Sequence, residues 1–175
     1  HKRMEATETQ LLEIKKVEQS TKDLSRDYFQ YRPDYKKYVL TIQVRYPAGK
    51  SDLKDMITTD KDAQLRQLAA AGCEIRDFLK NHNENQYILI IEGQASKDNF
   101  LYNYELSYQR ALGLMRFWIE DSNITFGNNC EILISGSGDG KLDTHSMRET
   151  SNEKENQRFL IHILPKNIFE HNENK

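Results

Sequence analysis

The chain has 175 residues, 37% hydrophobic and 30% charged, with 25 Lys and Arg against 27 Asp and Glu and a formal net charge of -2. This near balance produces no strong overall field that would favour nucleic acid or an anionic membrane as a partner. No apolar run approaches the length of about 20 residues that spans a bilayer. The length suits one domain with an additional segment.

The N-terminal part is polar and helical in pattern. Residues 5–30 carry only a narrow apolar stripe at helical spacing. Such a helix cannot form a core alone, so it is a linker, a coiled-coil stem or a helix docked on the main domain. Pro33 ends the pattern. We therefore assign residues 1–34 to a helical linker or stem, 35–168 to the main domain and 169–175 to a flexible tail.

The main domain alternates between strand and helix patterns. Residues 38–46 alternate apolar and polar side chains, as a half-buried strand does, whereas residues 87–91 are nearly all apolar, as a central strand is. The expected elements are a strand from Tyr38 to Tyr46, a helix from about Asp60 to Asn81, a strand from Tyr87 to Ile91, a helix from about Asn103 to Glu120, and strands from Glu131 to Ser135 and from Phe159 to Leu164.

This order has a clear architectural consequence. A β-α-β-α-β-β sequence predicts an α/β fold, a two-layer sandwich with a mixed sheet and helices on one face, here preceded by an N-terminal helix. The polar and glycine-rich residues 136–156 are expected to form a mobile surface loop. Asp60 or Asp62 is expected to cap the helix that begins near them.

One short run carries most of the functional information. Asn-Tyr-Glu-Leu-Ser-Tyr-Gln-Arg-Ala, residues 103–111, follows a strand that closes on Ile91-Glu92-Gly93. An arginine on the first turns of a helix beside a strand end is well placed to hold a carboxylate, because its planar fork binds bidentately and the helix N-terminus adds positive potential. Together with the later runs at 135–138 and 156–158, this motif resembles the OmpA-like peptidoglycan-binding domain family from Tyr38 to Pro165.

The resemblance implies a ligand for the motif. In the family, the motif arginine binds the carboxylate of diaminopimelate in the peptidoglycan stem peptide, which makes Arg110 the main candidate; the alternative is a surface arginine paired with a nearby glutamate. Asn103 and Leu106 match the Asn and the Leu of the motif. Asn103 either contacts the ligand or caps the helix. Arg158 matches a family arginine that reaches the ligand's carboxylates, with a surface ion pair as the alternative.

The sequence also departs from the family pattern. The family usually places an aspartate just after the strand, where this chain has Ser96, and an arginine where it has Gln157. The aspartate supplies the charge that holds the ligand's ammonium group, and a serine hydroxyl cannot replace it. Asp98, two residues further on, can substitute for it, as can Glu92 from the strand.

The resemblance therefore implies a non-catalytic cell-wall anchor in the bacterial periplasm, tethered to a membrane by a segment outside this chain. With the stem-like helix, it favours a MotB-like ion-driven stator, whose partners are the peptidoglycan stem peptide, a membrane ion-channel subunit and a second copy of the chain, with no nucleic acid. The alternative is a protein-interaction domain of the same fold that has lost or altered peptidoglycan binding, which Ser96 and Gln157 favour.

No cofactor, metal site or catalytic set is expected. The run Gly136 to Lys141 lacks the spacing of a phosphate loop, and the five histidines are scattered. Cys73 and Cys130 form either a disulfide or, as we favour, two free thiols.

Overall fold

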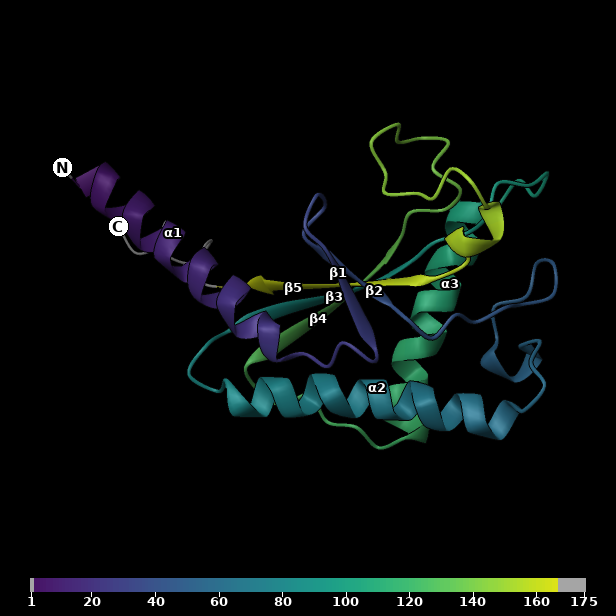
Figure 1. The fold of residues 1–175 in the computed structure, drawn as a ribbon, viewed down its shortest axis with the longest axis horizontal. Coiled ribbons are helices and arrows are strands. Elements are labelled where there is room, and N and C mark those ends of the chain that lie inside the picture. Colours follow the sequence, from purple (N-terminus) through teal and green to yellow (C-terminus); the bar gives the residue numbers. More distant parts are fainter. Residues whose placement is uncertain (1, 167–175) are drawn as a thin grey trace.

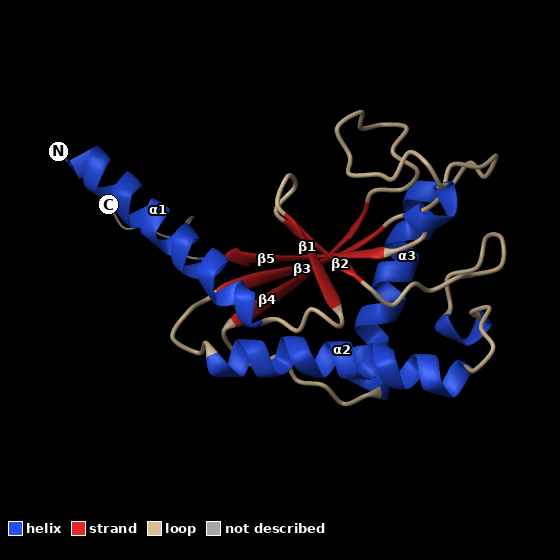
Figure 2. Ribbon diagram, in the orientation of Figure 1, coloured by secondary structure: helices blue, strands red, loops and turns tan. Residues whose placement is uncertain are grey.

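The computed structural model describes residues 2–166 and consists of three α-helices against one five-stranded sheet (Figures 1 and 2). The elements are α1 (Lys2–Ser20), β1 (Phe29–Arg32), β2 (Lys37–Leu40), α2 (Lys61–Asn81), β3 (Tyr87–Gly93), α3 (Asn103–Arg116), β4 (Cys130–Gly136) and β5 (Phe159–Pro165). A single π-helical turn, Phe117–Asp121, extends α3. In the described range no helix is long and apolar enough to cross a bilayer.

The sheet is mixed, with strand order β1-β2-β5-β3-β4. β3 and β4 run parallel with Ile91 opposite Ile134, whereas β5 runs antiparallel to β3 with Ile161 opposite Ile91. The apolar strand β3 therefore lies inside the sheet, between β5 and β4, as its composition predicts.

The helices cover one face of this sheet. Alternate β3 residues, among them Leu89 and Ile91, are fully buried in one cluster with the apolar stripe of α2 and with Leu114 of α3. Trp118 joins the two helices, because its indole N–H donates to the Leu68 carbonyl oxygen at 2.7 Å. The predicted fold class, a two-layer α/β sandwich with helices on one face, is confirmed.

The opposite face of the sheet is covered in part by a loop. Met147 of the segment between β4 and β5 is buried against Val39 and Leu160 on that face. Nearby, Glu92 accepts hydrogen bonds from Lys37 (3.1 Å) and is 2.8 Å from His162. The expected mobile loop 136–156 is thus attached to the sheet through a buried side chain.

The ends of α2 and the later strands fall close to the expected positions. The Asp60 carboxylate accepts from the Ala63 N–H at 3.0 Å, so the expected N-cap is made by Asp60. β3 and β4 each extend to a glycine, and β5 extends to Pro165. Cys73 and Cys130 are free, half-buried thiols, as favoured.

The strand expected from Tyr38 to Tyr46 is shorter in the structure. β2 ends at Leu40, because its ladder with β5 contains only Tyr38 opposite Ile161 and Val39 opposite Leu160. Beyond that point the chain has no strand to pair with and bonds to other elements instead, for example through the Ile57 N–H, which donates to the Arg45 carbonyl. The alternation of buried side chains nevertheless continues through Val44 and Tyr46.

The sequence patterns also missed β1. It pairs antiparallel with β2, so the expected boundary between residues 34 and 35 falls in the turn of a hairpin. Val17 near the end of α1 and Leu24 just after it are buried in the main core, while Figure 1 shows the first turns of α1 extending beyond the sheet. The division into stem, domain and tail stays a prediction, and the tail 169–175 lies outside the described residues.

Candidate functional site

Two glycines at the strand ends allow α3 to approach the sheet. Gly93 and Gly136 lie opposite each other at the ends of β3 and β4. A Cβ on Gly93 would lie 2.0 Å from the Ser107 carbonyl oxygen, and one on Gly136 would lie 2.6 Å from the Tyr108 nitrogen. Backbone atoms cannot yield at such distances, so these positions require glycine, and their close approach fixes where the next turn of α3 places Arg110.

Arg110 is buried and lacks a carboxylate partner. The residue is only 5% exposed, and its Nε donates a hydrogen bond to the Lys50 carbonyl oxygen at 2.9 Å. Its guanidinium carbon lies 4.3 Å from the centroid of the Tyr46 ring, a cation–π contact. Among the described residues no carboxylate lies within ion-pair distance, which contradicts the alternative of a surface arginine paired with a glutamate.

The charge of Arg110 is held in an unfavourable environment. Burial lowers the pKa of the guanidinium, while Tyr46 and Asp98 act in the opposite direction. An arginine keeps its proton under all ordinary conditions, so the group remains a cation removed from water. Its terminal nitrogens have no hydrogen-bond partner within residues 2–166.

Arg158, immediately before β5, lies close to Arg110, and both side chains line the same cleft. It is 8% exposed; its Nε donates to Gln94 Oε1 at 2.8 Å and its Nη1 to Glu149 Oε1 at 3.1 Å. Glu149 also accepts from Arg32 at 2.8 Å. The second terminal nitrogen of Arg158, Nη2, is buried and has no partner in the described part of the chain. Arg158 is therefore in an ion pair and still has an unused donor.

Arg110 and Arg158 line one narrow cleft, which has no room for a water-sized molecule in this structure. The residues that form it are Val44, Tyr46, Gln94, Arg110, Gln157, Arg158 and Phe159. Arg110 belongs to α3 and Arg158 immediately precedes β5, so a helix and the start of a strand each contribute one guanidinium.

Asn103 joins the loop before α3 to the loop after β4. It is 2% exposed, and its Nδ2 donates to Asp98 Oδ1 at 2.9 Å and lies 3.3 Å from Asp139 Oδ2. The expected capping role is not seen, because the N-cap is Tyr102 without a side-chain bond. Asp98, an exposed residue, is held by this contact and by the Phe100 N–H at 2.9 Å. Leu106 is buried in the face of α3 that packs inward.

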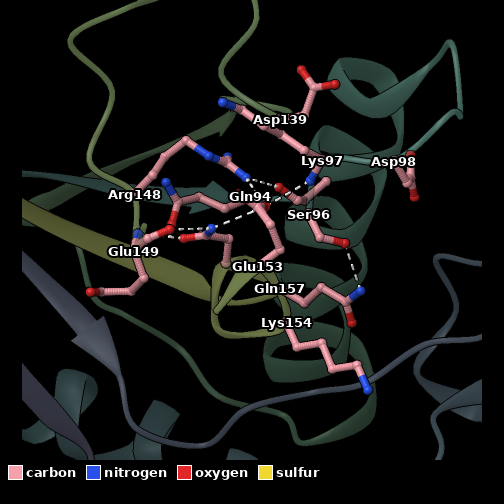
Figure 3. A network of polar contacts seen from close by, with 12 residues as sticks. Gln94, Ser96, Lys97, Asp98, Asp139, Arg148, Glu149, Glu153, Lys154 and Gln157 are labelled. Carbon is pink, nitrogen blue, oxygen red and sulfur yellow. Dashed lines mark hydrogen bonds and ion pairs between the residues drawn. The ribbon is translucent and has the colours of Figure 1, made fainter. Parts of the chain in front are cut away.

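The two positions that depart from the family pattern contact each other. Gln157 Nε2 donates to Ser96 Oγ at 2.9 Å, as Figure 3 shows. A neutral pair therefore occupies the two positions where the family carries an aspartate and an arginine. No local sequence pattern indicates this contact, because the two residues are 61 positions apart.

A polar network fixes the segment that carries Arg158 (Figure 3). Asn156, fully buried, accepts from the Glu149 N–H at 2.7 Å and donates to the Glu149 carbonyl at 3.0 Å. Glu153 accepts from the Lys97 N–H at 2.9 Å and from Arg148 at 3.1 Å. These bonds tie the loop before β5 to the loop after β3, which sets the position of Arg158.

Sequence reasoning missed Tyr46, Gln94 and Lys50 as parts of this site. The alternating pattern places Tyr46 on the buried face of a strand, but it cannot distinguish a ring packed on a core from a ring packed on an arginine. The contribution of Lys50 is a backbone carbonyl, which no side-chain pattern reveals.

No protein-family model matches the sequence, and no curated protein matches it. Among solved structures, the chain is similar to a MotB-like protein from Desulfovibrio vulgaris, at 14% identity and a TM-score of 0.50, covering 95% of this chain and 97% of that chain. The periplasmic domain of Helicobacter pylori MotB matches at 15% identity and a TM-score of 0.48, over 82% of this chain and 84% of that one. An outer membrane protein from Borrelia burgdorferi B31 matches at 18% identity and a TM-score of 0.47, over 78% and 95%.

The first of these similarities defines the class of the fold. The chain shares the fold of that MotB-like protein, an α/β fold with a mixed sheet, and in this chain a helix precedes the first strand. At this level of identity the similarity concerns the fold alone.

Proposed function

We propose that this chain is a non-catalytic domain that binds the peptidoglycan stem peptide, with Arg110 as the main anchor for a carboxylate. The observation that carries the proposal is the buried guanidinium without an acidic partner in the described residues. Removing an ion from water costs several kcal/mol, and a cation–π contact returns only about 2 kcal/mol. A ligand carboxylate bound by the remaining donors would offset the rest.

Asp98 is the residue we propose for the ligand's ammonium group. Ser96 carries no charge and is engaged with Gln157. Asp98 is exposed, and its Oδ1 is fixed by Asn103 and by a backbone N–H, while its Oδ2 has no partner in the described range. Asn103 is then a positioning residue for Asp98, and Leu106 supports the helix beneath the site.

The cellular setting follows from the same proposal. A peptidoglycan-binding domain acts in the bacterial periplasm, and we propose that an upstream segment tethers it to a membrane. The solved MotB structures include domains described as periplasmic. By the same reasoning, a second copy of the chain and a membrane ion-channel subunit are the proposed protein partners.

The test is retention on purified peptidoglycan sacculi. The parent protein should sediment with sacculi, and Arg110→Ala should lose at least tenfold in retention because it removes a charge-assisted bidentate contact of about 2 kcal/mol or more. Arg110→Lys keeps the charge but loses the fork, and should lose most of the binding. Arg116→Ala is the matched control, since Arg116 is an exposed arginine on the same helix.

A second candidate function is a protein-interaction domain that has lost wall binding. The neutral Ser96–Gln157 pair at the two departing positions favours it, because this pair offers the ligand no charge. Failure of the folded parent protein to sediment with sacculi would contradict the proposed anchor and support this candidate.

A further inference from the structure

The hydroxyl of Tyr46 is a buried donor with no assigned role. Tyr46 is 7% exposed, and its hydroxyl oxygen has no hydrogen-bond partner in the part of the chain that the structure describes. Buried polar groups are nearly always paired, so an unpaired hydroxyl indicates a missing partner.

Within the described part of the chain, Tyr46 and Arg158 each have a buried, unpaired group that can donate, and both line the same cleft as Arg110. Tyr46, Arg110 and Arg158 each are more than nine-tenths buried and line the same narrow space. Arg158 Nη2 is likewise buried and unpaired within the described residues. Guanidinium groups cannot accept hydrogen bonds, so their partner must be an acceptor, and the two neighbouring positive charges favour an anion over a neutral acceptor.

The hydroxyl of Tyr46 is neutral and has a proton to donate. Burial raises the pKa of the Tyr46 hydroxyl, and the charge of Arg110 offsets only part of this effect. The hydroxyl therefore keeps its proton throughout the physiological range.

We propose that Tyr46 is a ligand-contacting residue: its hydroxyl donates to a carboxylate held between Arg110 and Arg158, while its ring positions Arg110. This inference rests on the proposed function, because it concerns the same cleft. A carboxylate presents about four lone-pair sites, enough for two guanidinium groups and one hydroxyl. The three donors would thus select a carboxylate rather than a neutral amide.

The loop that follows Tyr46 packs on α3 beside Arg110. The Lys50 carbonyl oxygen accepts a hydrogen bond from Nε of Arg110 at 2.9 Å. The Ser51 carbonyl oxygen lies 3.3 Å from the position that a Cβ on Gly113 would take. The loop is therefore packed directly on α3. The cleft admits no water-sized molecule in this arrangement, so binding of a carboxylate requires the side chains that line it to move apart.

The test compares two probes by NMR titration of the whole chain. One is the tripeptide L-Ala-γ-D-Glu-meso-diaminopimelate, and the other is pimelate, a dicarboxylate without ammonium groups. Tyr46→Phe, which removes only the hydroxyl, should weaken the binding of both probes about tenfold, the value of one hydrogen bond to a charged group. Tyr35→Phe, at an exposed tyrosine in the β1–β2 turn, should leave both affinities unchanged.

Thermal unfolding without ligand separates this role from a structural one. Because Tyr46→Phe removes an unpaired buried hydroxyl, its unfolding midpoint should equal or exceed that of the parent. A lower midpoint together with weaker binding would mean that the hydroxyl supports the fold, and would overturn the inference.

The probes also distinguish the inference from the proposed function. If the parent binds pimelate but not the tripeptide, and Tyr46→Phe weakens the binding of pimelate, the inference holds and the stem peptide is rejected as the ligand. Tripeptide binding that Tyr46→Phe leaves unchanged would keep the proposed function and overturn the inference. No binding of either probe to the parent would overturn both.

Discussion

The two faces of the sheet are covered in different ways, and the site draws on both. One face is buried under α2 and α3 by apolar side chains, including Leu114 and Trp118. The other is covered in part by Met147 and by the Lys37–Glu92–His162 cluster, while Leu133 and Leu164 remain 43% and 39% exposed.

This difference suggests that the residues that stabilise the fold and those that determine ligand binding lie mainly on different faces of the sheet. Arg110 comes from the helix that closes the apolar face, and Arg158 from the segment that the polar network holds near the other face. The helix side should therefore dominate the free energy of unfolding, whereas the loop side should determine pH response and ligand preference.

The largest expected effect is on the helix-covered face. Trp118→Ala removes a fully buried ring and its bond to Leu68, and should lower the free energy of unfolding by about 3–5 kcal/mol. Urea denaturation measures this loss. The comparison variant is Leu133→Ala on the opposite face, where a half-exposed side chain should cost about 1 kcal/mol or less. Equal losses would contradict the contrast between the faces.

The next effect concerns pH on the loop-covered face. Burial alone would raise the pKa of Glu92, but the hydrogen bond from His162 and the charge of Lys37 outweigh it and lower the pKa to about 2. Glu92 therefore contributes stability that is complete above its unfolded pKa of about 4.5 and is lost as the pH falls from about 5 toward 2. The contribution at neutral pH is on the order of 3 kcal/mol.

Glu92→Gln isolates this contribution from those of other carboxylates. The difference in unfolding free energy between the parent and Glu92→Gln, measured by denaturation across pH 2 to 7, should be largest at pH 7 and shrink toward pH 2. A difference that does not change with pH would show that the carboxylate charge is not the cause.

The smallest expected effect is a change in ligand affinity caused by a substitution at Ser96. Ser96→Asp restores the acid that the family carries and should tighten binding of the diaminopimelate tripeptide about tenfold, a gain of about 1.4 kcal/mol, without tightening pimelate. Isothermal titration calorimetry measures both. Asn83→Asp adds the same charge at an exposed turn after α2 and serves as the control. Equal tightening of both ligands would argue against an ammonium contact at this position.

Local patterns determined most of the elements. The apolar runs of β3, β4 and β5, the stripe of α2 with its Asp60 cap, and the motif at the start of α3 depend on residues close together in the chain, so their periodicity was sufficient to predict them. The same motif identified Arg110 as the residue of interest, and its role as an anchor stays a prediction.

Only the tertiary structure decided the rest. β1 has no alternating pattern of its own and exists because β2 pairs with it, and the strand expected through Tyr46 stops at Leu40 because β5 supplies no further partner. The stacking of Tyr46 on Arg110, the contact of Ser96 with Gln157, and the bond from Arg158 to Gln94 join residues about 60 positions apart. Such contacts follow from how the layers pack. The sequence alone could not reveal them, because local conformational preferences do not depend on which distant residues become buried together.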